Sequence, residues 1–316
     1  GIGQIRLFNS LPKAGAEAAT FPFCHFEPNV GVVEVPDHRI YDLAAMFKPK
    51  KTTPAFTRFV DIAGLVAGAS KGEGLGNQFL SHIRETDAIA HVVRCFEDGN
   101  ITHVEGSIDP VRDMDIINTE LCLADLESVD KKKTKTAKLA QAGIKQAKAD
   151  LPVLEKVYDA LQNGTPARAL DLSDDDLEVL KELNLITLKP VLYVLNMAED
   201  DIADPLANEY VQAASKEAEK EGAKWVPISA EIEEEVSELD GEEAKAFLAD
   251  LGEEEPGLNR LIRTAYSMLG LINFFTVGPD ECRSWTVRAG TKAPKAAGKI
   301  HSDIERGFIR AEIVSY

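Results

Sequence analysis

The sequence predicts an α/β protein whose mainly parallel sheet is interrupted by an inserted helical hairpin and followed by a small β-rich (α+β) module. Short apolar segments alternate with helical patterns, an apolar seam lies between two of those segments, and the C-terminal part is broken by glycine and proline. The chain has 316 residues, of which 44% are hydrophobic and 28% are charged. It can therefore bury a substantial core, in one large domain or in about two to three ordinary ones.

Four apolar segments are the predicted strands: FTRFVD (56–61), AIAHVVRCF (88–96), PVLYVLN (190–196) and KWVPIS (224–229). Strands that are buried on both faces and separated by helices form mainly parallel sheets. Ligands of such sheets bind beyond the carboxyl ends of the strands. We therefore expect functional residues directly after Val60, Cys95, Leu195 and Ile228.

An apolar seam with alternating spacings of three and four residues predicts the helical hairpin between the second and third strands. The seam comprises Ile144, Ala147, Leu151, Leu154, Tyr158 and Leu161. Pro152 complicates one continuous helix, and Asp150 is a candidate cap for a fresh helical start. The expected organisation is a first sheet-forming part at 1–115, the helical insertion at 116–185, a second sheet-forming part at 186–271 and the β-rich module at 272–316.

Composition excludes several classes of protein. There is no apolar run of about 18 residues and no secretory signal pattern, so we expect a cytoplasmic protein that does not enter a membrane. The four cysteines form no CxxC pair, which argues against a zinc site or a disulfide framework. A formal net charge of -18 argues against direct DNA binding. Seven lysines without an acid between 131 and 148 are expected to form a solvated helix face.

Three short motifs follow the predicted strands. Asp61 and Gly64 form a DxxG pattern, in which the acid can hold Mg²⁺ through water and the glycine lets its backbone N–H approach a terminal phosphate. The motif Asn196-Met197-Ala198-Glu199 follows the third strand, where an Asn and an acid can meet a nucleobase edge. Ser229-Ala230 fits a short loop that closes over a base through backbone groups.

The stretch FVDIAGLVAGASKGEGLGNQFLSHIRETDAIAHVVRCFED (59–98) resembles the YchF/Obg-like ATPase family, a branch of the Obg-type P-loop NTPases. Three other segments do the same: FPFCHFEPNVGVV (21–33), EEPGLNRLIR (254–263) and AGKIHSDIERGFIRAE (297–312). The resemblance covers almost the whole chain. It implies a P-loop G domain, an inserted coiled coil and a C-terminal TGS domain, in a cytosolic Mg²⁺-dependent NTPase that uses ATP or GTP and associates with ribosomes.

The resemblance also assigns residue roles. Asp61 and Gly64 become the Mg²⁺ and γ-phosphate elements of switch II, residues 21–29 correspond to switch I, and Asn196 to Glu199 match the NxxE base-binding motif. Leu65 matches an apolar residue where Ras-type enzymes place a water-orienting glutamine, which predicts slow hydrolysis assisted by metal, backbone and, as a candidate, K⁺. Because the usual Asp is Glu199 here, preference for guanine is weakened.

The segment GIGQIRLFNSLPKAG (1–15) departs from the family pattern, which ends its glycine-rich loop with Gly-Lys-Ser-Thr. Aligned on LFN, Gly3 keeps the glycine, whereas Gln4, Ile5 and Arg6 replace the lysine, the Mg²⁺-binding serine and the threonine. Gln cannot neutralise phosphate charge and Ile offers no oxygen to a cation. His25 stands at the metal-sensing threonine of switch I, with an exposed loop residue as the alternative interpretation.

Two interpretations of these departures remain open. Either the chain binds nucleotide poorly, or the sequence is incomplete or misread at residues 1–6; the TGS module, which stops in mid-domain, favours the second. The leading hypothesis is an ATP-hydrolysing, nucleotide-dependent switch on the ribosome, with GTP as a second substrate. The alternative is a nucleotide-independent ribosome- or RNA-binding adaptor with a degenerate pocket.

Overall fold

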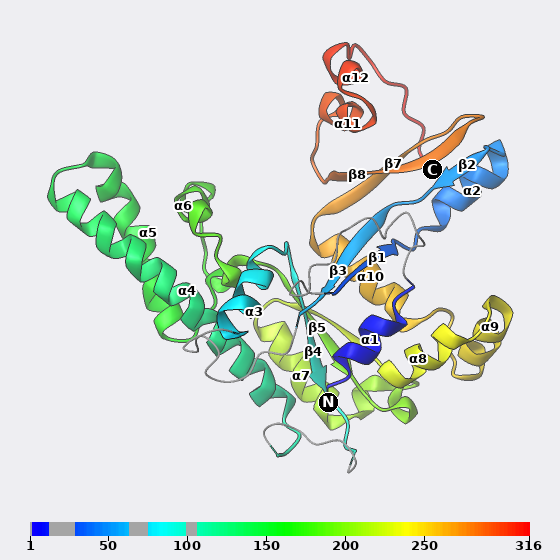
Figure 1. Cartoon of the computed structure of the whole chain (residues 1–316), viewed down its shortest axis with the longest axis horizontal. Coiled ribbons are helices and arrows are strands. Elements are labelled where there is room, and N and C mark those ends of the chain that lie inside the picture. Colours follow the sequence, from blue (N-terminus) through cyan, green and yellow to red (C-terminus); the bar gives the residue numbers. More distant parts are fainter. Residues whose placement is uncertain (1, 13–28, 63–74, 99–105) are drawn as a thin grey trace. The chain divides into compact units, whose positions relative to one another are not determined.

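The computed structural model describes residues 2–12, 29–62, 75–98 and 106–316 (Figure 1). The chain divides into two compact units, one made of residues 1–4 and 62–231 and the other of residues 5–61 and 232–316. No helix in the described ranges is both long enough and apolar enough to span a membrane.

The first unit is built on a parallel sheet of three strands in the order β4-β5-β6. These strands are β4 (Ile89–Arg94), β5 (Val191–Asn196) and β6 (Lys224–Ile228), close to three of the predicted segments. Every residue of the central strand β5 is buried, as the uninterrupted apolar sequence VLYVLN predicts. Helices α3 (Leu75–Arg84) and α7 (Glu209–Lys220) belong to the same unit.

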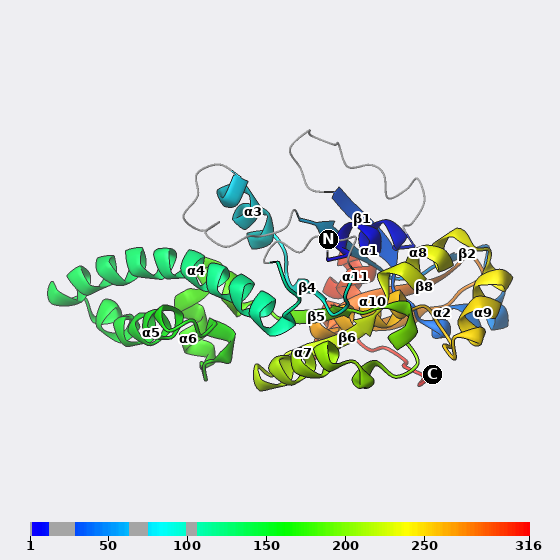
Figure 2. The ribbon, with the colours of Figure 1, turned by 90° about the horizontal axis from the view of Figure 1, so that it is seen from below.

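A long helical hairpin interrupts the chain between β4 and β5. Helix α4 (Pro110–Gln141) starts at the Asp109 cap and packs lengthwise against α5 (Lys145–Gln162), as Figure 2 shows. Its core holds Val129, Leu154 and Leu161, together with Leu180 from the short helix α6 (Asp174–Leu180). The first predicted seam residue, Ile144, is 48% exposed, because it precedes α5 as its N-cap.

The expectation of a fresh helical start at Pro152 was wrong. Helix α5 runs through Pro152, and Asp150 accepts a hydrogen bond from the Gln146 side chain at 2.8 Å instead of capping. An interior proline removes one backbone donor. Here Leu154 and Val157, in the turns after the proline, pack in one core cluster with Val129 of α4, and this packing stabilises the helix.

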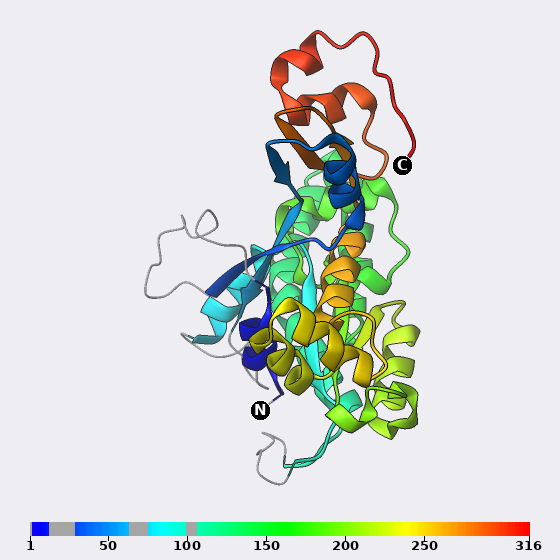
Figure 3. The ribbon, with the colours of Figure 1, turned by 90° about the vertical axis from the view of Figure 1, so that its right-hand side faces the viewer.

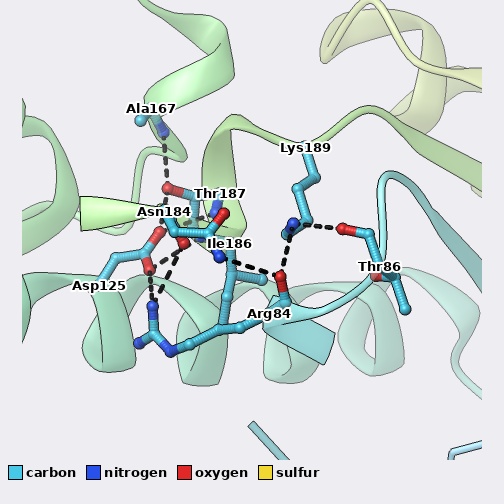
Figure 4. Close-up of polar contacts among 8 residues, drawn as sticks. All are labelled: Arg84, Thr86, Asp125, Ala167, Asn184, Ile186, Thr187 and Lys189. Carbon is cyan, nitrogen blue, oxygen red and sulfur yellow. Dashed lines mark hydrogen bonds and ion pairs between the residues drawn. The ribbon is translucent and has the colours of Figure 1, made fainter. Parts of the chain in front are cut away.

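A buried carboxylate fixes α4 to the segment that leads into β5 (Figure 4). Asp125 of α4 is fully buried and accepts hydrogen bonds from the backbone N–H groups of Ile186 and Thr187, at 3.0 and 2.7 Å, and from the Thr187 hydroxyl at 2.6 Å. The Arg84 guanidinium lies 3.8 Å from the same carboxylate. Burial raises the pKa of Asp125, although these hydrogen bonds and Arg84 oppose the shift.

The C-terminal end of α3 is held by the same segment. The Arg84 carbonyl accepts from the side chains of Asn184 and Lys189, both at 3.1 Å, and the Thr86 carbonyl accepts from Lys189 as well. Apolar side chains of α3 and α4, including Leu80 and Leu121, pack together beside these contacts. Helix α3 and the hairpin are therefore joined by both polar and apolar contacts.

The second unit contains two small sheets. One pairs β1 (Asn29–Glu34) with β3 (Phe56–Asp61) in antiparallel register, with Val30 opposite Val60. The other has the order β2-β8-β7, formed by β2 (Lys51–Thr53), β7 (Leu271–Thr276) and β8 (Glu281–Arg288). Three helices lie wholly in this unit: α2 (His38–Phe47), α9 (Gly241–Asp250) and α10 (Gly257–Met268). Two others belong to it except for their first residues: α1 (Gln4–Ser10) without Gln4, and α8 (Ala230–Glu238) without residues 230–231.

Two details of the second unit differ from the expectation. In the described ladders β3 pairs with β1 in antiparallel register and not with the parallel strands, because apolar content predicts a strand but not its partner. The predicted β-type run that begins at Gly298 is helical instead: α11 (Ala293–Ile300) packs against β8, and α12 (Ser302–Arg306) packs against α11 (Figure 3). Pro294 in the first turn and the His301 side chain, which accepts from Asp303 N–H at 3.1 Å, begin these helices.

Candidate functional site

The carboxyl ends of β4, β5 and β6 lie side by side at one edge of the parallel sheet. The ladder continues past the strands, because Cys95 N–H donates to the Asn196 carbonyl and Met197 N–H donates to the Ile228 carbonyl, both at 2.8 Å. This edge is where the sequence places its base-binding motifs. In parallel sheets it is also the general location of ligands.

Asn196, the last residue of β5, joins three segments that are distant in the sequence. Its side chain is 2% exposed. The amide Nδ2 donates to the Ile2 carbonyl at 3.0 Å, and Oδ1 accepts from Ala230 N–H at 2.9 Å. Because both partners are backbone groups, this brace depends on the Asn196 side chain and not on the side chains at positions 2 and 230.

Gly3 is required by that brace. Its φ of +89° lies in the left-handed region, and a Cβ at this position would stand 2.2 Å from Asn196 Nδ2 and 3.4 Å from the Ala230 Cβ. Any larger residue would displace the amide that donates to Ile2. The glycine that the sequence alignment retains therefore allows the N-terminal turn to approach the end of β5.

Gln4 and Ile5 are the residues that the sequence alignment predicts at the P-loop lysine and serine positions. The Gln4 amide Nε2 donates to the Ile62 carbonyl at 2.5 Å, so this side chain is tied to the backbone directly after Asp61. Ile5 is 68% exposed and has no oxygen. Arg6 forms an ion pair with Glu234 at 3.0 Å in the second unit.

The remaining residues of the predicted base-binding set differ in burial, and Glu199 is the most exposed of them. Ser229 is fully buried and Ala230 is 2% exposed at the start of α8. Met197 is also 2% exposed, so its side chain is closed off from solvent and does not line an open surface. Glu199 begins a 3₁₀ turn, Glu199–Asp201, and is half-buried.

Asp61 ends β3, opposite Asn29, and is half-buried. The other residues predicted to contact phosphate or metal, Gly64, Leu65 and His25, lie outside the described residues, so their assignments stay predictions. Within the described ranges no group of three or more His, Cys, Asp or Glu side chains could hold a metal ion.

Two polar residues at this edge were not predicted. Arg94, the last residue of β4, is 2% exposed, and its Nε donates to the Phe96 carbonyl at 3.1 Å, which shapes the loop after the strand. Asn208 caps α7 by accepting from Tyr210 and Val211 N–H, and its amide donates to the Cys95 carbonyl at 2.9 Å. The only sequence signal was an Asn before a helical pattern, which is typical of an N-cap.

Cys95 lies at the same edge but is not a nucleophile. Its side chain is fully buried, and burial raises the pKa of its thiol to about 12. Only the thiolate reacts as a nucleophile, so the side chain is an inert part of the core.

The chain is similar to several known proteins. A family model described as "50S ribosome-binding GTPase" matches residues 1–120, and the model of the YchF GTPase C-terminal domain, described as "Protein of unknown function (DUF933)", matches residues 271–316. The ribosome-binding ATPase YchF of Bacillus subtilis is 51% identical over 315 residues, which are 100% of this chain and 86% of that protein. The Haemophilus influenzae protein of the same name is 53% identical, with the same coverage.

A solved structure is similar as well. The YchF GTPase of Schizosaccharomyces pombe matches with a TM-score of 0.83 and 40% sequence identity, over 97% of this chain and 83% of that one. This likeness confirms the expected α/β P-loop fold. Because close relatives match it along its full length, the chain belongs to the YchF family.

Proposed function

We propose that this chain binds a nucleoside triphosphate at the edge of the β4-β5-β6 sheet and hydrolyses ATP, with GTP as a second substrate. It would act as a nucleotide-dependent switch on the ribosome. The observation that carries the proposal is the Asn196 brace, which holds the Gly3 turn and the Ser229–Ala230 loop at one sheet edge. The relatives' printed name, ribosome-binding ATPase, supports both the substrate and the partner.

In this proposal the base lies against the loops that Asn196 braces. Glu199 and the backbone at Ser229–Ala230 would face its edge, and the backbone of Gly3 and Gln4 would face the phosphates. A carboxylate matches the two donors of guanine better than the donor and acceptor of adenine. Because Glu199 replaces the shorter Asp, its carboxylate would lie farther out than an Asp carboxylate and would pair less well with guanine. This argues for an ATP-using site that tolerates GTP.

Mg²⁺ would arrive as part of the nucleotide complex. The described residues near the candidate site offer few ligands, because the Ile5 side chain lacks an oxygen and β3 ends in one carboxylate, Asp61. The described residues therefore do not fit a complete protein site for the ion. A site with so few charged groups, and with Leu65 in place of a water-orienting residue, should hydrolyse slowly.

Isothermal calorimetry with ATP and with GTP, each in excess Mg²⁺, tests the proposal. We expect binding to the wild type, and at least tenfold weaker binding to Asn196→Ala, because the buried Ala230 N–H and Ile2 carbonyl lose their partner. Asn163→Ala, which removes the same side chain at the exposed end of α5, should bind as the wild type does. Absence of heat from both nucleotides with the wild type would refute nucleotide binding.

A second candidate function is a nucleotide-independent ribosome-binding adaptor. It is favoured by Gln4, whose amide is already bonded to the Ile62 carbonyl, and by the apolar Ile5. Co-sedimentation with ribosomes separates the two functions. A switch should pellet differently with ATP, with a non-hydrolysable analogue and without nucleotide, whereas an adaptor should pellet equally in all three.

A further inference from the structure

Asn208, at the start of α7, uses every hydrogen-bonding group of its side-chain amide. Its Oδ1 accepts from the backbone N–H groups of Tyr210 and Val211, at 2.8 and 3.1 Å. Its Nδ2 donates to the Cys95 carbonyl at 2.9 Å and to the Asp201 carboxylate at 2.8 Å. A side-chain amide has two N–H donors and one oxygen that accepts twice, so its full bonding capacity is used within the first unit.

Capping of α7 accounts for only the accepting half of this amide. An N-cap needs an oxygen that accepts from the first turn of the helix, and Ser, Thr or Asp supplies one as Asn does. The bonds donated by Nδ2 add nothing to the cap, because both acceptors lie outside the helix. Cys95 directly follows β4, and Asp201 ends the 3₁₀ turn Glu199–Asp201. The donating half of the Asn208 amide therefore has a second role.

The two donated bonds hold the segment 196–201, which follows β5 and contains the predicted base-binding motif. Cys95 N–H donates to the Asn196 carbonyl at 2.8 Å, so one acceptor of Asn208 is itself paired with the last residue of β5. The other acceptor, Asp201, is the last residue of the segment. The segment is therefore fastened at both ends, at Asn196 and at Asp201, with Glu199 between them.

We propose that Asn208 is a positioning residue that sets the base preference of the site by holding the turn that carries Glu199. This assignment rests on the proposed function, in which the Glu199 carboxylate faces the edge of the base. Glu199 opens the 3₁₀ turn whose last residue is bound by Asn208, so that bond restricts the backbone from which the carboxylate extends. Adenine and guanine differ in which edge atoms donate and accept, and a carboxylate distinguishes them only if it is held in one place.

The substitution Asn208→Asp separates the capping role from the positioning role. The new carboxylate still accepts from the first turn of α7, where a negative charge is favourable. It has no donor for the Cys95 carbonyl and it repels the Asp201 carboxylate, so the turn is released. Adding Asp201→Asn supplies an amide donor opposite residue 208 and restores that bond with donor and acceptor exchanged. The matched control, Asn163→Asp, makes the same change in charge at the exposed end of α5.

Calorimetry with ATP and with GTP, each in excess Mg²⁺, measures the ratio of the two Kd values. The wild type and the Asn163→Asp control should distinguish the nucleotides by about fivefold or more, the effect of one hydrogen bond to the base. In Asn208→Asp the two Kd values should lie within about twofold of each other, and adding Asp201→Asn should restore discrimination. A cap alone would change the stability of α7 and leave the ratio as it is. An unchanged ratio in Asn208→Asp, or a wild type that binds both nucleotides equally, would overturn the proposal.

Amide hydrogen exchange without nucleotide tests the positioning role independently of binding. Residues 199–202 should exchange about fivefold faster in Asn208→Asp than in the wild type, whereas the amides of α7 should keep the wild-type rate because their cap is retained. Failure of the inference differs from failure of the proposed function. The proposed function fails if neither nucleotide gives heat with the wild type. The inference alone fails if nucleotides bind and exchange at residues 199–202 is the same in both proteins.

Discussion

Glu233 of α8 should make the second unit less stable as the pH rises towards neutrality. The side chain is 3% exposed, and its Oε1 accepts from Gly257 N–H at 2.7 Å, at the start of α10. Burial raises the pKa of this carboxyl from 4.5 to about 7, against the opposing effect of the Gly257 and Leu258 amides and of Arg260. The folded state therefore holds a proton that the unfolded chain releases above pH 4.5.

The sign follows from proton linkage. Between the unfolded pKa of 4.5 and the folded pKa of about 7 the folded state binds more protons, so stability falls as pH rises through this range and then levels off. A pKa raised from 4.5 to about 7 corresponds to about 3 kcal/mol of lost stability at pH 8. Glu233→Gln keeps an acceptor for Gly257 N–H but does not ionise. We expect the variant to exceed the wild type by less than about 1 kcal/mol at pH 5 and by up to about 3 kcal/mol at pH 8.

The assay is urea unfolding followed by fluorescence at several pH values between 5 and 8. The chain has two tryptophans, Trp225 in β6 and Trp285 in β8, so a Trp225→Phe background makes the signal report the second unit. Glu235→Gln, at an exposed position on the same helix, is the matched control. The reasoning is refuted if Glu233→Gln and the wild type show parallel stability curves across this pH range.

Two further substitutions test other parts of the molecule. Asp125→Ala should destabilise the first unit by about 3 kcal/mol or more, because the Ile186 and Thr187 donors stay buried without an acceptor. Urea unfolding monitored by Trp225 fluorescence in a Trp285→Phe background measures this loss of stability. A loss under about 1 kcal/mol would contradict the prediction. Gln4→Lys combined with Ile5→Ser should tighten ATP binding about tenfold or more in calorimetry, because it supplies a cation and a hydroxyl; unchanged affinity would show that residues 4 and 5 do not face phosphate.

Sequence patterns predicted the positions of the three parallel strands, but they did not predict β1 or the pairing between distant strands. β4, β5 and β6 lie within a residue or two of the predicted segments, and the fully buried β5 is the strand whose apolar sequence is uninterrupted. β1 was not predicted as a strand, since NVGVVE is short and interrupted by Gly31. The pairing of β2 with β8 joins residues about 230 positions apart, and no local pattern contains that information.

Sequence patterns placed Asn196 at the end of a buried strand, but they did not predict its hydrogen-bond partners. Asn196 stands where the sequence placed it, at the end of a buried strand, whereas its bond to the Ile2 carbonyl spans 194 positions. Arg94 and Asp125 were overlooked because a charged residue in an apolar pattern is normally assigned to the surface. Both are buried and fully engaged with backbone groups, a property that only tertiary structure reveals.

The two candidate functions share the same fold and differ in how strongly residue 4 would bind the phosphates of a nucleotide. The Asn196 brace uses backbone groups of Ile2 and Ala230, so the base end of the site does not depend on Gln4 or Ile5. Replacing a lysine by glutamine at the phosphate end removes a charge-assisted hydrogen bond of about 1.5–3 kcal/mol, or about 10- to 150-fold in Kd. A site that loses this much still binds nucleotide, at a concentration higher by the same factor. Gln4 and Ile5 would therefore raise the nucleotide concentration at which the switch responds. Their presence does not exclude a nucleotide-dependent switch.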